Sequence, residues 1–434
     1  MNRLKALAKW LTPGIGVKRW LILLLAGIFL NALGLALAIL NVAHVEQIDS
    51  LIPSIGWMEI AIAEVVGLLV ISIAFYELSR NILAPYRKHQ PMPVIDAVYA
   101  HNLRRKGLKV VVVGGGTGLP SVLKGLKPLT SNITAIVTVA DDGGSSGRLR
   151  RELGVLPPGD LRNNIAALAD DESLMTRLFQ YRFDRGDLGG HSFGNLFISA
   201  LAAVTGSLEQ ALIETERVLN IQGRVLPSTL DDVTLVASVM LPGARRSTTI
   251  RGESKITETG GQIEQISIAP ADVEAYAGSV RAILNADIVV LGPGSLYTSI
   301  LPNMLVKDIA DALRATSAYK IYVCNIATQP GETEGYTVAE HVLALERHIG
   351  RGVFQLVIAN NAFPTLNAGA NTHYVPQAPA HHEILQRYEI RYTDLVDVER
   401  PWRHDPQKLA RAIMDAGEAE RASDGRALAR VPTL

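Results

Sequence analysis

The sequence of 434 residues is long enough for two or three folded units, or for one large α/β domain with additions. Its 42 lysines and arginines balance 42 aspartates and glutamates, and this zero net charge argues against a nucleic-acid binder, which would show a basic excess. The single cysteine, Cys324, excludes an intrachain disulfide framework and suits a reducing compartment, and we expect it to pack in the core.

The N-terminal part carries two long apolar runs. Residues 20–43 contain 24 residues without a charge, enough for a helix that crosses ~30 Å of hydrocarbon. A second run at 60–76 follows a short loop. The length of the first run, the lack of a small-residue cleavage site and the closeness of the second run argue against a cleaved signal peptide. The sequence predicts a transmembrane hairpin over residues 1–79, with spans at about 20–43 and 58–78.

Basic side chains flank both runs. They are Lys5, Lys9, Lys18 and Arg19 before the first, and Arg80, Arg87 and Lys88 after the second. By the positive-inside rule both flanks are cytoplasmic. We therefore expect a multi-pass protein of the inner or plasma membrane whose N- and C-termini are both cytoplasmic.

The second run contains one acid, Glu64. An ionisable residue inside a span is a functional candidate by default, because its burial in lipid is costly. The alternative is that Glu64 faces the partner helix or a dimer contact. We favour this alternative, because a two-helix anchor offers no conduction path.

Residues 80–108 have the composition of a basic linker. Its cluster of Arg104, Arg105 and Lys106 would gain about 1 kcal/mol per charge near anionic lipid headgroups. A solvated face is an equally good interpretation of the same cluster.

From residue 109 the pattern changes to short apolar runs that alternate with amphipathic stretches. Buried strands are expected at 109–113, 133–139, 233–241, 286–291, 320–325 and 354–360. Helices are expected near 118–127, 160–180, 195–220, 303–315 and 337–348. This alternation predicts a Rossmann-like, doubly wound, mostly parallel α/β sheet over 109–415, in which ligands bind beyond the carboxyl ends of the strands.

Two segments depart from this rhythm. Residues 247–270 combine Gly and Thr with alternation, which indicates an antiparallel hairpin or excursion. Residues 416–434 are charged and Ala-rich, and we expect a disordered tail there.

The first expected strand runs into GGGTGLP at residues 114–120, whose glycines would let a phosphate approach backbone N–H groups at a helix N-terminus. No Gly-Lys-Ser/Thr follows, which excludes the Walker A pattern, and Leu119 replaces the third glycine of the dinucleotide fingerprint. An NAD-type dinucleotide binder is therefore a weaker alternative. The expected anion cradle is formed by Gly115, Gly116, Thr117 and Gly118.

The second strand runs into VADDGGSSGRLR at residues 139–150. An acid at this position of a Rossmann-like fold holds ribose hydroxyls, and the same Asp141 and Asp142 are oxygen ligands suited to Mg²⁺. Because the loop has no third carboxylate, we expect hydroxyl contacts, with Mg²⁺ at this acid pair as the alternative. Further groups suited to a phosphate-containing ligand follow: Gly144, Ser145, Ser146 and Arg148.

Four later loops add polar side chains. Asp160 of LPPGDLRNNI (156–165) is expected to cap the next helix. His191 of GGHSFGN (189–195) is expected to hydrogen-bond a ligand, because no nucleophile stands at a diagnostic spacing from it. The other expected contacts are Arg162, Asn163, Asn195, Gly294, Ser295, Asn325, Thr328 and Gln329. Together the loops predict one large cleft for an extended, phosphate-containing ligand.

Five stretches, in this order, resemble the gluconeogenesis-factor (YvcK) branch of the CofD-like family: VVVGGGTGL, ITAIVTVADDGGSSGRLR, PPGDLRN, GHSFGNL and VVLGPGSLYTSILPN. The resemblance covers most of 109–410. It implies a Rossmann-like core, binding of a nucleotide sugar such as UDP-GlcNAc, and a role in carbon metabolism and in cell-envelope or cell-shape control.

CofD itself is an Mg²⁺-dependent transferase that builds a deazaflavin coenzyme from 2-phospholactate donors. Such transferases carry a loop of roughly GPSNP where Gly292–Ser295 stand, so the resemblance favours the other branch. The segment PWRHDP (401–406) is also similar to the family's end segment. There Asp405 would start a helix, and Arg403 is a candidate pyrophosphate contact.

The leading hypothesis is a membrane-anchored regulatory protein that binds a UDP-sugar on its cytosolic side and has no assigned catalytic residue. The alternative is a CofD-like transferase in which Asp141 and Asp142 bind Mg²⁺. No nucleic acid partner is expected. A protein partner and association with a second copy stay open.

Overall fold

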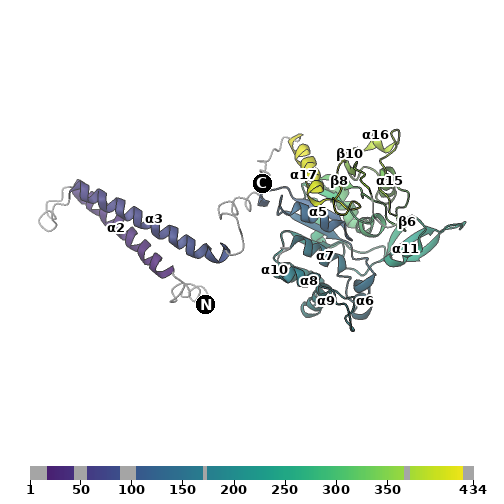
Figure 1. Ribbon diagram of the computed structural model, residues 1–434, viewed down its shortest axis with the longest axis horizontal. Coiled ribbons are helices and arrows are strands. Elements are labelled where there is room, and N and C mark those ends of the chain that lie inside the picture. Colours follow the sequence, from purple (N-terminus) through teal and green to yellow (C-terminus); the bar gives the residue numbers. More distant parts are fainter. Residues whose placement is uncertain (1–16, 44–55, 88–103, 170–173, 366–371, 424–434) are drawn as a thin grey trace. The chain divides into compact units, whose positions relative to one another are not determined.

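The computed structural model describes residues 17–43, 56–87, 104–169, 174–365 and 372–423. The chain divides into two units, residues 1–99 and residues 100–434 (Figure 1). The first contains two long helices, and the second contains the sheets and the remaining helices.

The helices of the first unit are α2 (Val17–Ala43) and α3 (Trp57–Arg87). Within them, Arg19–Val42 and Trp57–Arg80 are each 24 residues long and apolar enough to cross a membrane by length and composition. The two expected spans are therefore helical. The preceding residues and the connecting loop, on which the expected orientation depends, lie outside the described residues.

Glycines bring α2 and α3 into close contact. A Cβ at Gly34 would lie 2.7 Å from Oε1 of Glu64, and a Cβ at Gly67 would overlap the Asn31 amide. Small residues of this kind let two helices in lipid approach closely. Glu64 thus faces the partner helix, as favoured from the sequence.

The second unit is built on a parallel sheet of seven strands in the order β10-β9-β8-β7-β1-β2-β3. The strands are β1 (Val110–Gly114), β2 (Ile133–Val137), β3 (Arg224–Pro227), β7 (Ile288–Leu291), β8 (Tyr319–Val323), β9 (Leu356–Asn360) and β10 (Glu389–Thr393). Chain order runs outward from β1 in one direction and from β7 in the other. The doubly wound parallel sheet expected from the sequence is confirmed.

Connections between parallel strands are right-handed as a rule, so a strand order that runs both ways from β1 and β7 places helices on both faces of this sheet. In one group, α5 (Leu119–Leu126) contacts both α7 (Gly159–Leu168) and α17 (Pro406–Ser423). In the other, α14 (Lys307–Ala315) contacts α12 (Ala277–Leu284) and α13 (Leu301–Met304), and α13 contacts α15 (Val338–Ile349). The remaining helices are α6 (Gly144–Leu153), α8 (Leu174–Gln180), α9 (Phe193–Thr205), α10 (Leu208–Leu219), the π-helix η1 (Leu296–Ile300) and α16 (Ile384–Arg387).

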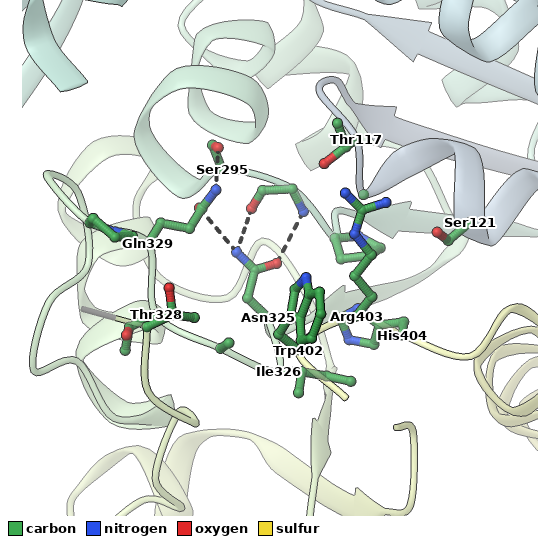
Figure 2. A pocket seen from close by; sticks show the side chains of 16 residues that line it. Thr117, Ser121, Ser295, Asn325, Ile326, Thr328, Gln329, Trp402, Arg403 and His404 are labelled. Carbon is green, nitrogen blue, oxygen red and sulfur yellow. Dashed lines mark hydrogen bonds between the residues drawn. The ribbon is translucent and has the colours of Figure 1, made fainter. Parts of the chain in front are cut away.

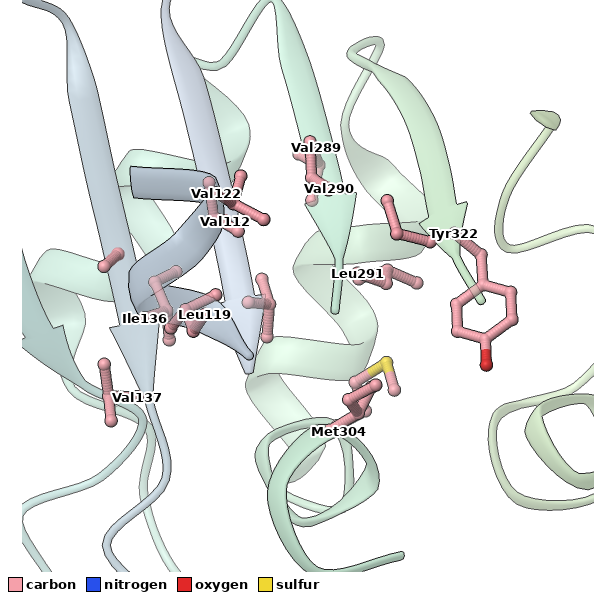
Figure 3. Close-up of a cluster of buried hydrophobic side chains, with 14 of the residues drawn as sticks. Val112, Leu119, Val122, Ile136, Val137, Val289, Val290, Leu291, Met304 and Tyr322 are labelled. Atoms are coloured by element: carbon pink, nitrogen blue, oxygen red, sulfur yellow. The ribbon is translucent and has the colours of Figure 1, made fainter. Parts of the chain in front are cut away.

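The core lies between these helices and the central strands. Figure 3 shows Leu119 and Val122 of α5 and Met304 of α13 gathered around the valines of β1 and β7. Every residue of β1 and β7 is buried, which explains their unbroken apolar sequence. Cys324, directly after β8, is buried as expected.

The expectation for residues 233–241 was wrong in one respect. They form β4 (Thr234–Met240), which belongs to a separate antiparallel sheet with β5 (Thr248–Arg251) and β6 (Gln262–Ala269). Burial alternates along β4, as in an antiparallel strand with one covered face. The excursion expected at 247–270 is present, and it contains a short helix, α11 (Glu253–Thr259).

Other boundaries also differ from expectation. The expected helices at 160–180 and 303–315 are each divided in two, into α7 and α8 and into α13 and α14. The segment 195–220 is two helices, because Gly206 adopts a positive φ of 72° and Ser207 caps α10. The expected tail from 416 begins as helix, since α17 continues to Ser423 and buries Ala416 in the same stripe as Ile413. The rest of that tail lies outside the described residues.

Gly125 is the point where α5 and α17 approach most closely. A Cβ there would overlap the Pro406 carbonyl oxygen and lie 2.8 Å from Cβ of Ala410. We expect Gly125→Ala to lower the free energy of unfolding by ~1–3 kcal/mol, because α17 must move outward. Urea unfolding of the full chain in mild detergent measures this. Lys124→Ala, on the exposed side of α5, is the control, and equal stability of the two variants would contradict the packing described.

Candidate functional site

The site is built where the strand order reverses. β1 and β7 are parallel neighbours, with Val113 opposite Leu291, so the loops that follow them start side by side. These loops are 114–118 and 292–295, the two glycine-rich turns seen in the sequence. A Cβ at Gly118 would lie 2.7 Å from the Pro293 oxygen, so glycine is required for the loops to touch. Such a reversal point is where open α/β sheets leave a crevice for ligands.

A buried asparagine that sequence reasoning missed fixes this pair of loops. Asn303 is fully buried, and its Nδ2 donates to the Gly114 oxygen at 3.0 Å and to the Ser299 oxygen at 2.7 Å. It therefore ties the end of β1 to the turn after β7. Its place in SILPN carried no signal for this role, because the contact joins residues 189 positions apart.

Beside the two loops lies a cavity of about 240 Å³ (Figure 2). It contains the predicted contacts Thr117, Gly118, Gly294, Ser295, Asn325, Thr328, Gln329 and Arg403. Loops that follow three different strands thus meet at this cavity, together with the segment before α17. The cavity also contains Trp402 and His404, which the sequence analysis did not select.

Hydrogen bonds between side chains set one wall of the cavity. Asn325 donates from Nδ2 to the Gly294 oxygen at 2.8 Å and accepts the Gly294 N–H at 3.2 Å. Gln329 donates to Ser295 Oγ at 2.6 Å. Thr328 is bonded instead to the backbone of His373. Asn325 and Gln329 therefore position the second glycine turn, and Thr328 anchors the segment behind it.

Arg403 supplies the positive charge of the cavity. Its side chain is exposed and extends toward Thr117 (Figure 2), and within the described part of the chain it forms no ion pair. The adjacent His404 is buried, contacts the Cys324 oxygen through Nε2 at 3.2 Å, and has a pKa lowered by burial to about 4. Neutral His404 thus anchors the segment while Arg403 stays available to an anion.

The predicted acid pair is held by two different helices. Asp141 accepts the Gly143 N–H at 2.9 Å at the start of α6. Asp142 accepts both the N–H and the hydroxyl of Ser254, on α11, at 2.9 and 2.8 Å. Burial raises the pKa of Asp141, and the neighbouring Asp142 adds to the shift. The excursion therefore closes over the loop that follows β2.

The expected role of Asp160 was wrong. Helix α7 starts at Gly159 with Pro158 as its cap, so Asp160 already lies in the first turn. Its carboxylate reaches across and accepts the Gly116 N–H at 2.7 Å. Burial raises the pKa of Asp160 to about 6. One N–H of the predicted anion cradle is thus already bonded to a carboxylate.

Two further carboxylates complete an acidic cluster. Burial, followed by repulsion from Asp141 and Asp142, raises the pKa of Glu253 to about 8. Glu332 is buried, accepts the Thr298 hydroxyl at 2.9 Å, and also acts on Glu253. Sequence reasoning missed both, because they are far from the acid pair in the chain. Within the described ranges, no three His, Cys, Asp or Glu side chains are arranged to hold a metal ion by themselves.

The remaining predicted contacts form a separate polar group between the starts of α6, α7 and α9. Asn195 donates to Ser145 Oγ at 3.0 Å, and the same hydroxyl contacts Nδ1 of His191 at 3.0 Å. Burial and then Arg148 lower the pKa of His191, which favours the neutral ring. None of these residues lines the cavity described above.

Two arginines of this group already donate hydrogen bonds within the protein. Arg148 donates to the Gly189 oxygen at 2.7 Å, and Arg162 donates to Asn163 at 2.7 Å. Arg162 is buried and its Nε has no partner among the described residues, like Oδ1 of the buried Asn195. Buried polar atoms are usually bonded, so this group retains capacity for a ligand or water.

The chain matches the family model described as 2-phospho-L-lactate transferase CofD over residues 110–413. A Nostoc sp. protein, provisionally named a gluconeogenesis factor, is 43% identical over 437 residues, which cover 95% of this chain and 93% of that protein. The gluconeogenesis factor of Bacillus subtilis is 47% identical over 254 residues, 58% of this chain and 78% of that protein. A crystal structure of a UPF0052-family protein from Bacillus halodurans has a TM-score of 0.66 and 40% identity, covering 70% of this chain and 99% of that one.

The acidic cluster makes the free energy of unfolding depend on pH. Glu253 has a pKa of about 8 in the folded protein against an ordinary glutamate pKa of 4.5, so between these values the folded state holds a proton that the unfolded state lacks. The free energy of unfolding should therefore fall as pH rises from about 4.5 to about 8, by up to ~1.4 kcal/mol per pH unit.

Urea unfolding at a series of pH values measures this slope. We expect Glu253→Gln to flatten it between pH ~6 and ~8, above the pKa of Asp160, and to be more stable than the parent at pH ~8. Glu258→Gln, which changes an exposed acid of the same helix, should leave the slope unchanged. A parental slope in the Glu253→Gln protein would show that the proton resides elsewhere.

Proposed function

Because the chain belongs to the CofD family and, within it, to the gluconeogenesis factors, we propose that it is a membrane-anchored regulatory protein that binds a nucleotide sugar of the UDP-GlcNAc kind. Two helices long enough to span a membrane support the anchor. The name of the relatives supports a role in carbon metabolism. Control of the cell envelope or cell shape, with the soluble unit in the cytoplasm, forms part of the same proposal.

The observation that carries the proposal is Arg403 in the cavity beside the two glycine turns. A guanidinium that forms no ion pair with any described residue, next to backbone that only glycine permits, suits the negative oxygens of a pyrophosphate. The neighbouring Trp402 offers an aromatic face to a base or a sugar.

The size of the cavity indicates how such a ligand would lie. At about 240 Å³ it is smaller than the ~300–1,000 Å³ typical of pockets for drug-sized ligands. A nucleotide sugar would therefore place its pyrophosphate and one end there, and extend across the glycine turns. Asp141 and Asp142 lie on the far side and would accept hydrogen bonds from sugar hydroxyls.

Replacing the arginine tests this arrangement. We expect Arg403→Gln to weaken UDP-GlcNAc binding by roughly tenfold to a hundredfold, the loss of one charge-assisted contact to phosphate. Isothermal titration calorimetry measures the dissociation constant. Arg400→Gln removes an exposed charge from the same segment and should bind like the parent. Unchanged affinity in Arg403→Gln, or tighter binding of NAD than of UDP-GlcNAc by the parent, would contradict the proposal.

A second candidate function is a CofD-like transferase that needs Mg²⁺. The convergence of Asp141, Asp142, Asp160, Glu253 and Glu332 favours it, because carboxylate oxygens are preferred Mg²⁺ ligands. The residues fit a Mg²⁺ ion held by one or two carboxylates, waters and a ligand phosphate, which is a common way for proteins to bind this ion. When bound, the ion would polarise a phosphoryl oxygen.

Thermal shift measurements with UDP-GlcNAc in EDTA and in Mg²⁺ separate the two candidates. We expect the nucleotide sugar to raise the melting temperature in EDTA as well as in Mg²⁺, because Arg403 and the glycine turns bind the phosphates directly. Asp141→Asn should weaken binding equally in both conditions. Strict Mg²⁺ dependence together with product formation would establish the transferase instead.

A further inference from the structure

The edge of the sheet opposite the candidate site has a groove lined by basic side chains. All seven strands are parallel, so their amino ends share one edge. A groove lies there between the starts of β1, β2 and β3 and the end of α12. It is lined by Lys109, Ser131, Asn132, Arg224, Arg281 and Asn285, among others.

Three cations and no carboxylate line this groove in the part of the chain that the structure describes. Lys109, Arg224 and Arg281 are exposed. The nearby acidic side chains accept hydrogen bonds from other groups. Asp287 accepts the Lys109 backbone N–H at 2.8 Å and lies 3.8 Å from Arg421.

Two glutamates near Arg224 are committed as well. Glu216 is half-buried and accepts the Val225 N–H at 2.7 Å. Glu209 accepts the Tyr276 hydroxyl at 2.5 Å. Arg224 also acts on Glu216 electrostatically. Among the described residues, however, Lys109, Arg224 and Arg281 form no salt bridge, so their charged groups are open to an outside partner.

The chain enters the second unit beside this groove. Asn132 donates from Nδ2 to the Arg105 oxygen at 2.9 Å and to the Gly107 oxygen at 2.8 Å. Thr130 donates to the Leu108 oxygen at 2.9 Å. These bonds fix the backbone that carries Arg104, Arg105 and Lys106 against the residues of the groove. The entry segment and the groove together form one surface with six basic side chains, called here the basic edge: Arg104, Arg105, Lys106, Lys109, Arg224 and Arg281.

We propose that the basic edge docks on anionic lipid headgroups of the membrane that holds α2 and α3. The inference rests on the proposed membrane anchor. Only residues 88–103 separate α3 from the entry segment, and a chain of that length spans at most about 55 Å when fully extended. The tether therefore keeps the basic edge at high effective concentration near the lipid surface. Each basic residue near such a surface adds to the attraction.

Docking in this manner orients the unit. The carboxyl ends of the strands, with the cavity and the acidic cluster, lie at the opposite edge of the sheet and face away from the headgroups. A soluble nucleotide sugar then reaches the cavity from the aqueous side, while the acidic cluster is kept from a surface of its own charge.

Vesicle sedimentation tests the proposal on residues 104–434 and on the full chain. The crystallised relative, 99% of which matches 70% of this chain, supports the folding of this unit without the hairpin. The vesicles contain phosphatidylcholine alone, or phosphatidylcholine with about one-third phosphatidylglycerol, whose headgroup supplies the anionic charge. We expect residues 104–434 to bind only the anionic vesicles, and less as salt is raised.

The decisive variant combines Lys109→Gln, Arg224→Gln and Arg281→Gln. It should bind anionic vesicles at least tenfold more weakly. The matched control combines Arg185→Gln, Arg245→Gln and Arg246→Gln, which removes the same charge from exposed positions outside the groove and should bind like the parent. Equal melting temperatures of the two variants verify that both are folded.

Three results would overturn the proposal: full binding by the groove variant, equal losses in both variants, or binding to phosphatidylcholine alone. Competition by millimolar inorganic phosphate would also overturn it, in favour of a soluble anion. UDP-GlcNAc affinity should be the same in both variants, so failure of the nucleotide-sugar proposal is seen separately. Recovery of the full chain outside the membrane fraction would refute the anchor and, with it, the docking.

Discussion

The reversal of strand order between β1 and β7 is the constraint on which the rest of the molecule depends. Because both strands are central and parallel, their connections leave toward opposite faces, and such a reversal leaves a crevice between their carboxyl ends. The chain closes this gap with two turns that touch through Gly118 and Pro293 and are tied by Asn303. A side chain at Gly118 would push these turns apart and take the cavity wall with them.

Electrostatic repulsion between carboxylates is a second constraint on the site. The loop after β2 and the helix α11 bring Asp141, Asp142 and Glu253 together in a partly buried place, where repulsion between carboxylates is weakly screened. Nearby N–H and hydroxyl groups stabilise the charges of the aspartates, whereas the pKa of Glu253 rises to about 8. The cluster therefore carries a proton at neutral pH, and binding of a cation would favour release of this proton to solvent. Both proposed functions would use the carboxylates of this cluster to bind a ligand.

The sequence predicted those features that depend on short stretches of chain. Unbroken apolar runs located β1, β2, β7, β8 and β9, and glycine-rich turns after them located the cavity. The sequence did not predict β10, nor that β4 belongs to another sheet, because partial or alternating burial leaves a weak pattern of apolar residues. Asp160 and Glu253 escaped for a different reason. Their roles come from contacts with residues 44 and more than 100 positions away, which no local pattern encodes.

Acidic and basic side chains gather in different places, although their total numbers are equal. A formal net charge of zero gave no reason to expect a charged surface, yet the two edges of the sheet differ. Carboxylates gather at the carboxyl ends of the strands, and Lys109, Arg224 and Arg281 lie at the amino ends. The chain enters at the basic edge because β1 is the first strand, so a tether from a membrane necessarily reaches that edge first. A domain of this topology, if it is anchored through its N-terminus to an anionic surface as proposed, would gain orientation from charges that leave the net charge of the chain at zero.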